Sequence, residues 1–539
     1  MRRNLDRLAN ETFDLLIVGG GVTGACVARD AALRGYKVAL VERGDFASAT
    51  SAHNSKLIHG GLRYLKNFEL GLVRESLRER RVWQRVAPHL VRPLPFLIPL
   101  HGGSTKERTT LGIGLTLYDV LSFDRTWLDD PAQRLPRHSW LKRDVALAEE
   151  PVLERPDFDG AFKYYDAQMY SPERLALECL LDADAHGAAM ANYVAATSLL
   201  IRDGKIEGAS VRDAMGDAAF DVRARLTLVA TGPWSDIFLD QALGKTTAHR
   251  ILRSKGIHLV VPPVSRKSAL TVAANGGHFF ILPWRGHTIL GTTDTAFTGD
   301  PDSVHVTEED IAEFLGFINA EMPAAKLKRS DVIHSYAGLR PLVDEGSGDT
   351  YDASRRAELI DHKEDGVEGL YSAIGGKWTT SRDLAQKIVD TLGAKLGSAA
   401  PCATKTTRLP GGAIDRIEDF SAAQKRAHRD LDGIDHLTRM YGTRLDAMLA
   451  EAGNRPELRQ PLGVTGDIGA QVLFAIREEM ALTLSDVVTR RTGIGQLGRP
   501  AADVLARTAD LMAAELNWDA PRRAREIDTV TNSLVVSAP

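Results

Sequence analysis

Residues 55–65 read SKLIHGGLRYL, a stretch that places an arginine and a tyrosine directly after two adjacent glycines. Glycine lets the backbone approach a bound ligand closely because it has no Cβ. The planar guanidinium of Arg63 suits a phosphate or a carboxylate, which it can grip through two parallel hydrogen bonds. We therefore expect Gly60 and Gly61 to carry the chain past a ligand and to present Arg63 and Tyr64 to it.

Residues 13–42 read FDLLIVGGGVTGACVARDAALRGYKVALVE. The apolar run 13–18 predicts a buried strand, the alanine-rich run 22–33 predicts a helix, and 36–41 predicts a second strand. A strand, a glycine turn, a helix and a strand in this order are typical of a dinucleotide-binding unit.

Gly19, Gly21 and Gly24 stand at G-x-G-x-x-G spacing within that unit. The first glycine permits a tight turn, the second lets the backbone approach a pyrophosphate, and the third lets the helix pack on the strand. The helix N-terminus adds free N–H groups and a partial positive charge. Glu42, 18 residues after Gly24, is placed to accept from ribose hydroxyls. A tight turn with incidental glycines is the alternative, and it explains less of this context.

A second segment, LTLVATGPWSD (226–236), is a buried-strand run followed by Ala-Thr-Gly. It resembles the second signature of FAD-binding Rossmann proteins, where the strand returns near the phosphate loop; an ordinary core strand with a turn is the alternative. No second G-x-G-x-x-G unit in strand context follows, although flavoproteins reduced by NAD(P)H usually carry two. The sequence therefore indicates FAD without a nicotinamide site, with electrons that come from the substrate itself.

The composition is that of a globular protein of two or three domains, with 539 residues of which 44% are hydrophobic and 26% charged. A formal net charge of −4 argues against binding to nucleic acid. Cys26, Cys179 and Cys402 form no disulfide framework or metal pattern, so a reducing, cytosolic compartment fits. The N-terminal apolar run leads into a strand rather than forming a signal peptide, and no window reaches the roughly 18 apolar residues of a membrane span.

Seven segments together carry a family resemblance: IVGGGVTG, VERGDFASATSAHNSKLIHGGLRYL, ATGPW, KGIHLVV, LGTTD, GLRPL and IGGKWTT. From about residue 13 to about residue 385, the chain resembles the FAD-dependent glycerol-3-phosphate dehydrogenases, flavoproteins of the glycine oxidase/D-amino-acid oxidase type. EEMALTLSDVVTRRT (478–492) is similar to the C-terminal helical domain of that family. The resemblance implies oxidation of sn-glycerol 3-phosphate to dihydroxyacetone phosphate, with FAD taking the hydride and a membrane quinone taking the electrons. It also implies a cytoplasmic protein held peripherally at the inner face of the cell membrane.

The resemblance further implies which residues bind the substrate. A phosphate dianion is bound best by several fixed cations, and the matched motifs supply them. The expected substrate residues are Arg63, Tyr64, Arg340 and Lys377, with Arg355 added from its spacing after Arg340. The alternative for each basic residue is a surface charge lying along its own stem. Only the fold would bring such distant side chains together.

Removal of the hydroxyl proton needs a base, and His258 in SKGIHLVV is the leading candidate, with a structural role on its strand as the alternative. Arg63 and Arg340 near the developing alkoxide would lower the hydroxyl pKa, so a dedicated base is not essential. His59 is placed to serve FAD instead. His53 departs from the family, which does not usually have histidine there. Related amine-oxidising flavoproteins attach FAD covalently through such a loop, but we expect a solvated histidine or a non-covalent contact.

The residues expected to contact FAD lie in the glycine turn, at the end of the second strand, in the loop before SKLIHGG, in ATGPW, and in GLRPL with GGKWTT. They are Gly19, Gly21, Gly24, Glu42, Arg43, Thr50, Ser51, Ser55, Lys56, Leu57, Gly60, Gly61, Thr231, Gly232, Gly338, Gly376, Lys377, Trp378 and Thr379. For the serines and threonines, a turn or N-cap role is the alternative.

We predict an α/β fold with three parts: a discontinuous Rossmann-type FAD-binding domain, an antiparallel-sheet substrate-binding domain and a C-terminal helical cap domain. Runs such as GHFFILPW and HTILGTTD suggest the antiparallel sheet, and apolar residues at three-to-four spacing suggest the helical domain. The predicted ranges are 1–85, 172–250 and 350–395 for the FAD-binding domain, 86–171 and 251–349 for the substrate-binding domain, and 400–539 for the helical domain.

A quinone acceptor requires access to a bilayer. VAPHLVRPLPFLIPLHGG (86–103) and TTLGIGLTLYDVL (109–121) combine apolar residues with Arg92, Lys106 and Arg108, which suits a peripheral membrane contact. The alternative is that both segments are core beneath the substrate sheet. The sequence leaves open a homodimer.

Three other functions compete with the dehydrogenase. A glycerol-3-phosphate oxidase, which uses oxygen and makes hydrogen peroxide, would have the same substrate motifs. An amine or amino-acid oxidase would need one arginine for a carboxylate rather than several cations for a dianion. A non-enzymatic FAD-dependent regulator or a tRNA-associated flavoprotein is disfavoured by the net acidic charge and the missing basic stripe.

Overall fold

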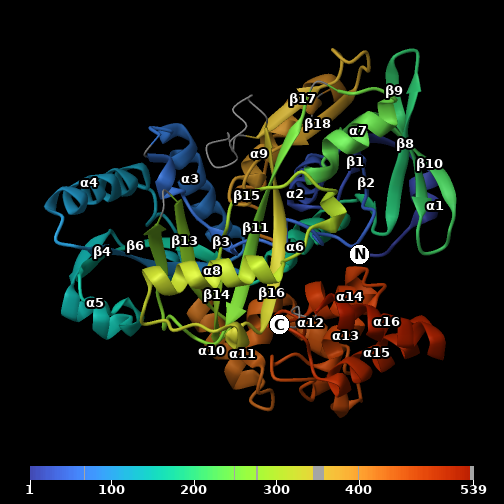
Figure 1. The fold of residues 1–539 in the computed structure, drawn as a ribbon. Helices are drawn as coiled ribbons and strands as arrows, with labels where there is room; N and C mark the ends of the chain where they lie inside the picture. The colour runs from blue at the N-terminus through green and yellow to red at the C-terminus, as the bar shows by residue number, and fades with distance from the viewer. Residues whose placement is uncertain (66, 248, 275–276, 344–356, 398–399, 535–539) are drawn as a thin grey trace.

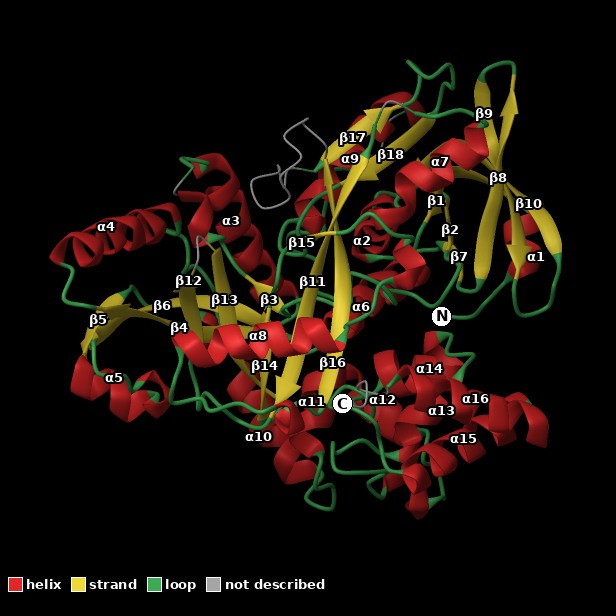
Figure 2. Cartoon of the chain, viewed as in Figure 1, coloured by secondary structure: helices red, strands yellow, loops and turns green. Residues whose placement is uncertain are grey.

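The computed structural model describes residues 1–539 except 66, 248, 275–276, 344–356, 398–399 and 535–539. Two β-sheets covered by helices make up the first three quarters of the chain, and the red C-terminal helices lie beneath both sheets in the view of Figure 1. The same view coloured by secondary structure separates the strand-rich upper part from the helical lower part (Figure 2). In the described part of the chain, every helix is too short or too polar to span a membrane.

The first sheet contains the dinucleotide motif. Its strands run in the order β17, β18, β10, β1, β2, β7; the last five are mutually parallel, and β8 and β9 extend β10 as an antiparallel hairpin. The bounds are β1 Thr12–Val18, β2 Val38–Val41, β7 Ala189–Ala191, β8 Val194–Arg202, β9 Lys205–Asp213, β10 Ala219–Val229, β17 Glu358–Asp361 and β18 Leu370–Ile374.

The apolar run of β1 is explained by helices on both faces of this sheet. Leu15 and Ile17 pack into the core formed with α2, α6 and α9, whereas Leu16 and Val18 pack into the core formed with α1 and α7. A parallel strand buried on both faces needs apolar residues at successive positions. These helices are α1 Leu5–Asn10, α2 Val22–Leu33, α6 Pro172–Ala185, α7 Ser235–Leu243 and α9 Ser381–Leu396.

The second sheet runs in the order β15, β11, β14, β13, β12, β4, β6, β3, with β16 on β11 and β5 on β6. All its pairs are antiparallel except β12 with β4. The bounds are β3 Leu57–Ile58, β4 Val91–His101, β5 Ser139–Lys142, β6 Phe158–Met169, β11 Ile251–Val261, β12 Ala269–Ala274, β13 Gly277–Trp284, β14 His287–Gly291, β15 Thr295–Ala296 and β16 His334–Val343.

Helices cover both faces of the second sheet as well. One face packs against α5 and α8, and the other packs against α3, α4 and the 3-10 turn η1. The bounds are η1 Leu62–Leu65, α3 Leu70–Val86, α4 Thr105–Leu121, α5 Arg143–Glu149 and α8 Glu308–Glu321.

The C-terminal helices form a core of their own and also pack against the first-sheet core. They are α10 Ile417–Ala427, α11 Ile434–Tyr441, α12 Leu445–Ala450, α13 Gly469–Glu479, α14 Leu484–Asp486, the π-helical turn η9 Val487–Arg491, α15 Ala502–Leu516 and α16 Ala520–Ser533. Asp45, just after β2, is buried between Arg490 and Arg491. Burial alone would raise the pKa of Asp45, but the charges of Arg491 and Arg490 outweigh it and hold that pKa below its usual value.

The predicted fold class is confirmed in all three parts. The predicted domain limits stay predictions; the strands and helices of the first sheet fall within 5–41, 172–243 and 358–396, while β3 at residues 57–58 joins the second sheet. The prediction of a membrane contact at 86–103 is wrong for most of that segment, because β4 lies between β12 and β6 and is largely buried. The segment 109–121 falls on α4, whose Ile113 and Val120 are exposed.

Candidate active site

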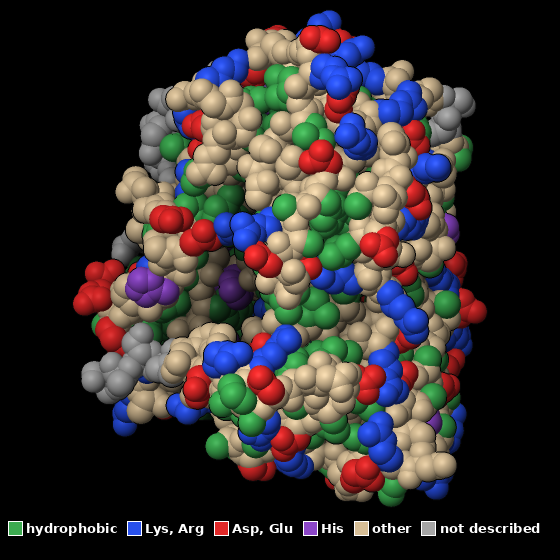
Figure 3. Space-filling model, turned by 90° about the vertical axis from the view of Figure 1, so that its right-hand side faces the viewer, with side chains coloured by type: hydrophobic (Ala, Val, Ile, Leu, Met, Phe, Trp, Pro, Cys, Tyr) green, Lys and Arg blue, Asp and Glu red, His purple; other side chains and the backbone are tan. Residues whose placement is uncertain are grey.

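A cavity of about 2070 Å³ lies between the two sheets. First-sheet residues such as Val18 and Ala230 line it on one side, and second-sheet residues such as His258 and Phe280 line it on the other. In Figure 3 the surface is hollowed on one side, with a histidine inside the recess and basic side chains on its rim. Ligand pockets usually measure about 300–1,000 Å³, so this space accommodates more than one small molecule.

One end of the cavity is built by the turn between β1 and α2. Gly19 has a φ of +113°, and a Cβ there would lie 2.5 Å from the carbonyl oxygen of Ala230. A Cβ on Gly24 would overlap the carbonyl oxygen of Gly19, so α2 can pack this closely only through glycine. Gly21 is the N-cap of α2 and has no side chain to cap it, and Gly21, Val22 and Thr23 of this helix start line the cavity.

Glu42 stands at the end of β2, as the sequence predicts. Its carboxylate accepts from the N–H of Gly20 at 2.6 Å and from that of Gly44 at 2.8 Å, and burial raises its pKa. Each oxygen keeps a second lone pair for a ligand hydroxyl. Glu42 therefore shapes the glycine turn in addition to facing the cavity.

The loop that follows β2 joins the two sheets. Thr50 donates from Oγ1 to the Leu339 carbonyl at 2.6 Å, and the Ser51 carbonyl accepts from Trp378 Nε1 at 3.0 Å. Ser51 Oγ also accepts from the N–H of Val22 at 2.8 Å, in the first turn of α2. These contacts fix the loop, and Thr50 and Ser51 line the cavity.

The other predicted FAD contacts mostly face the same space. Thr231, Gly232, Leu57, Gly376 and Thr379 line the cavity, and Thr379 Oγ1 accepts from the N–H of His59 at 3.1 Å. The shape and the exposed helix N-terminus fit a dinucleotide: a glycine cradle for a pyrophosphate, an acid at the end of β2, and a long apolar-walled channel toward the second sheet.

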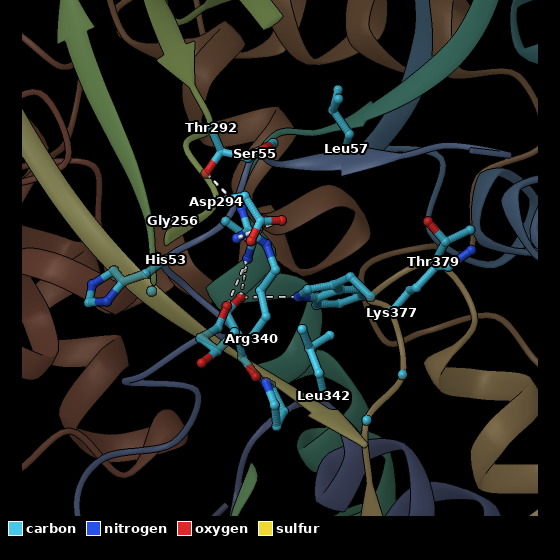
Figure 4. A pocket seen from close by; sticks show the side chains of 18 of the residues that line it. His53, Ser55, Leu57, Gly256, Thr292, Asp294, Arg340, Leu342, Lys377 and Thr379 are labelled. Atoms are coloured by element: carbon cyan, nitrogen blue, oxygen red, sulfur yellow. Dashed lines mark hydrogen bonds and ion pairs between the residues drawn. The ribbon is translucent and has the colours of Figure 1, made fainter. Parts of the chain in front are cut away.

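Arg340 of β16 stands at the centre of the opposite end (Figure 4). Its Nη1 donates to Ser254 Oγ at 2.8 Å, and its Nη2 donates to Thr292 Oγ1 at 2.8 Å and to the Thr293 carbonyl at 3.0 Å. A carboxylate oxygen of Asp294 lies 3.9 Å from Arg340 Nη1. The guanidinium is thus fixed in direction by groups of β11 and of the segment after β14, while the side chain keeps 21% exposure to the cavity.

Arg63 and Lys377 meet at the ring of Tyr64. The Lys377 ammonium lies 3.7 Å from the ring centroid, and the Arg63 guanidinium carbon lies 5.0 Å from it. Gly61, with a φ of +74°, turns the chain so that the ring folds back beside it. All four residues line the cavity, so the two cations and the ring form one unit of the site.

His258 of β11 is 2% exposed and lines the cavity. Its Nε2 lies 2.9 Å from Ser55 Oγ, and its ring stacks on Tyr336 with centroids 4.9 Å apart. Burial, reinforced by the charge of Arg340, holds the His258 pKa well below the ordinary 6.5. The imidazole is therefore neutral near pH 7.

Several predicted residues lie elsewhere. The Lys56 ammonium does not line the cavity; it is buried and pairs with Glu173 at 3.3 Å, so the prediction of an FAD contact is not supported by its position. Gly60 also lies behind the cavity wall, where a Cβ would overlap Tyr118. Arg43, by contrast, lines the cavity at its rim, where it is half exposed and pairs with Asp302.

Three further residues named from the sequence have separate outcomes. Gly338 lines the cavity and is crowded by the His53 carbonyl, which explains the need for glycine there. His53 is half-buried and lines the cavity, which fits the expected non-covalent contact better than a solvated side chain, and burial lowers its pKa to about 4. Arg355 lies outside the described residues.

Sequence reasoning missed the residues that hold the catalytic candidates in place. Ser254, Thr292 and Thr293 orient Arg340, and Tyr336 supports His258. The two threonines belong to LGTTD, one of the motifs that carry the family resemblance, and their polarity at a strand end was the available signal. Ser254 and Tyr336 carry no such signal, because their roles depend on the pairing of β11 with β16.

Comparison with known proteins agrees with this site. Residues 14–382 match the family described as FAD dependent oxidoreductase, and residues 402–523 match the C-terminal domain of alpha-glycerophosphate oxidase. A glycerol-3-phosphate dehydrogenase from Synechocystis is 40% identical over 511 residues, which are 92% of this chain and 91% of that protein. One from Mycobacterium leprae is 35% identical over 540 residues, 97% of this chain and 88% of that protein.

A solved structure shows the same architecture. The glycerol-3-phosphate dehydrogenase from Bacillus halodurans, complexed with FAD, superposes with a TM-score of 0.78 at 28% identity and covers 98% of this chain and 95% of that one. The fold and the site define an FAD-dependent oxidoreductase. Within that class, the chain belongs to the glycerol-3-phosphate dehydrogenase family.

Proposed function

We propose that this enzyme oxidises sn-glycerol 3-phosphate to dihydroxyacetone phosphate and passes the electrons to a membrane quinone. The observation that carries the proposal is that Arg63, Arg340 and Lys377 all line the cavity that begins at the dinucleotide turn. Three fixed cations suit a phosphate dianion, whereas a carboxylate substrate needs one. The names of the relatives support the same substrate.

The cations have different tasks in this proposal. Arg63 and Lys377, held against Tyr64, are placed to grip the substrate phosphate. Arg340, fixed by Ser254 and Thr292, is placed to stabilise the negative charge that develops on the hydroxyl oxygen. Because its donors are already oriented, little reorganisation is needed during the reaction.

His258 is the proposed proton acceptor. Its neutral imidazole lies 2.9 Å from Ser55 Oγ, and Ser55 itself lines the cavity. The substrate hydroxyl proton passes to Nε2, either directly or through the Ser55 hydroxyl. FAD, when bound, supplies the acceptor for the hydride that leaves the same carbon.

The proposed membrane contact is the outer surface of α4 and the turn after it. Ile113 and Val120 are 65% and 62% exposed, and Phe123 and Trp127 pack edge to face at 5.5 Å while remaining more than half exposed. Arg74 lies 4.4 Å from the ring of Phe123. Aromatic, aliphatic and cationic side chains in one place suit the interface of an anionic membrane.

The test is anaerobic mixing of the flavin-loaded protein with sn-glycerol 3-phosphate while the flavin absorbance is followed, with glycerol and D-amino acids as controls. We expect bleaching by the phosphorylated substrate alone. Reoxidation by a soluble quinone faster than by oxygen would support the dehydrogenase, and the reverse order would support the oxidase. No bleaching of a flavin-loaded sample would overturn the proposed substrate.

A further inference from the structure

A second group of cations lies outside the active site, where the second sheet meets α11. Arg92 comes from β4, Arg285 from the turn between β13 and β14, and Arg439 from α11. We name these three residues the arginine triad. None of them lines the cavity described above.

The triad is organised around Tyr170. The guanidinium carbons of Arg285 and Arg439 lie 4.3 Å and 4.1 Å from the centroid of its ring. The Tyr170 hydroxyl lies 2.7 Å from His436 Nδ1, which fixes the ring in place. Arg92 is close enough for its charge to act on Arg439, and burial together with that charge lowers the Arg439 pKa to about 9.

Within the described residues, carboxylates act on the triad only from a distance: those of Asp435, Asp130 and Glu418 partly offset the positive charge of Arg92. Among the described residues, no acidic group lies within 4.0 Å of any of the three guanidiniums. Buried Nε atoms of all three arginines, and Nη1 of Arg285, have no hydrogen-bond partner in that same part of the chain. Arg439 makes no hydrogen bond at all within it.

The acids nearest to the triad already have partners. Asp435 pairs with Lys425 at 2.8 Å, and Asp130 accepts from the N–H groups of Ala132 and Ile417. Asp467 accepts from His436 at 2.8 Å. Buried guanidinium donors without an acceptor are costly, so an acceptor from solution would lower the free energy of this region.

We propose that the arginine triad binds a phosphate-type oxyanion, either inorganic phosphate or the phosphate of a monoester, at the boundary between the substrate sheet and the C-terminal helices. Guanidinium forks match the oxygens of a phosphate through paired N–H donors, and the donors without partners belong to all three arginines. Because Arg439 belongs to the C-terminal helices and Arg92 and Arg285 to the second sheet, the anion would tie the two together. This inference does not depend on the identity of the substrate.

The test is thermal unfolding of the flavin-loaded protein with and without 10 mM inorganic phosphate, ionic strength being held constant with chloride at about that of 0.15 M salt. Phosphate also suits the active-site cations, so the measurement is made in an Arg340→Ala/Lys377→Ala background. We expect phosphate to raise the Tm of this background by about 2 °C or more. Adding Arg439→Met should abolish the rise, whereas adding Arg429→Met, an exposed arginine of the same domain, should leave it unchanged.

Two results would overturn the proposal. One is the absence of any phosphate effect in the Arg340→Ala/Lys377→Ala background, which would confine phosphate to the active site. The other is a phosphate effect that survives Arg439→Met. If Arg439→Met does not fold, Arg439→Lys replaces it; this variant keeps the charge but loses the fork, so the rise in Tm should shrink, and an undiminished rise would count against the triad. FAD content, measured by absorbance, verifies folding in every variant.

Discussion

At one end of the cavity the ligand-facing groups belong to the backbone of a single segment, the turn from β1 into α2. At the other end they are side chains of Arg63, His258, Arg340 and Lys377, which come from η1, β11, β16 and the loop between β18 and α9. A backbone cradle tolerates almost no added volume, because atoms of the same turn surround it. A side-chain cluster tolerates loss of one member at a graded cost, because the remaining cations still attract the ligand. The two ends should therefore respond differently to substitution.

The largest effect is expected at the backbone end. Gly24→Val places side-chain atoms where α2 packs on the carbonyl of Gly19, so the turn cannot close and the protein should contain little or no FAD. The ratio of flavin to protein absorbance measures this. Gly71→Ala, in the first turn of α3 with open space around it, is the matched control and should load normally. Normal flavin loading in Gly24→Val would show that the turn is not a tight cradle.

Arg340→Ala tests the side-chain end. Loss of charge-assisted hydrogen bonds worth about 1.5–3 kcal/mol should lower kcat/KM for glycerol 3-phosphate about 10- to 100-fold. FAD content should stay at the wild-type level, since the nucleotide end is untouched. Arg266→Ala, at an exposed arginine in the loop between β11 and β12, serves as the control. An unchanged kcat/KM in Arg340→Ala would show that Arg340 does not contribute to the reaction.

Substitutions of Tyr64 test whether its ring is needed at the side-chain end of the cavity. Tyr64→Ala removes the ring that holds Arg63 and Lys377, each contact being worth about 0.5–1 kcal/mol, so KM should rise several-fold to about 10-fold. Tyr64→Phe keeps the ring and should stay near the wild-type value. Steady-state kinetics at fixed acceptor concentration decide between them. Equal defects in both variants would point to the hydroxyl rather than the ring.

The smallest expected effect is on stability, and it involves His334 of β16 and His53 of the loop after β2. Burial lowers the pKa of His53 and of His334 to about 4 in the folded protein, whereas an unfolded histidine titrates near 6.5. Between these values the unfolded chain binds more protons, so stability is lost as the pH falls from about 6.5 towards 4. At pH 5.5 the loss should be about 1 kcal/mol for each histidine.

Thermal unfolding at pH 7 and at pH 5.5 measures this loss. His334→Gln should reduce the drop in Tm between the two values, while His305→Gln, at an exposed histidine, should not change it. An equal drop in wild type and His334→Gln would assign the pH dependence to other groups.

The nucleotide end was predictable because its information is local. The strand, the glycine turn, the helix and Glu42 occupy 30 consecutive residues. Gly24 is required by a contact inside that stretch, with Gly19, and Gly19 by a contact with Ala230 at the end of the next parallel strand. The family resemblance extended the prediction to Arg63, Arg340 and Lys377. Their spacing in the sequence did not show that they line one cavity.

Tertiary structure alone decided the rest. Lys56 stands beside predicted FAD contacts in the sequence, yet the left-handed backbone at that residue, with a φ of +55°, turns it to Glu173. The segment at residues 91–101 has the composition of a surface contact but lies between two strands. The direction of Arg340 depends on Ser254 across a strand pair and on Thr292, and the position of His258 depends on Tyr336. Sequence determines local backbone geometry because that depends on neighbouring residues, whereas the side a residue faces and the partner it meets depend on packing between segments hundreds of residues apart.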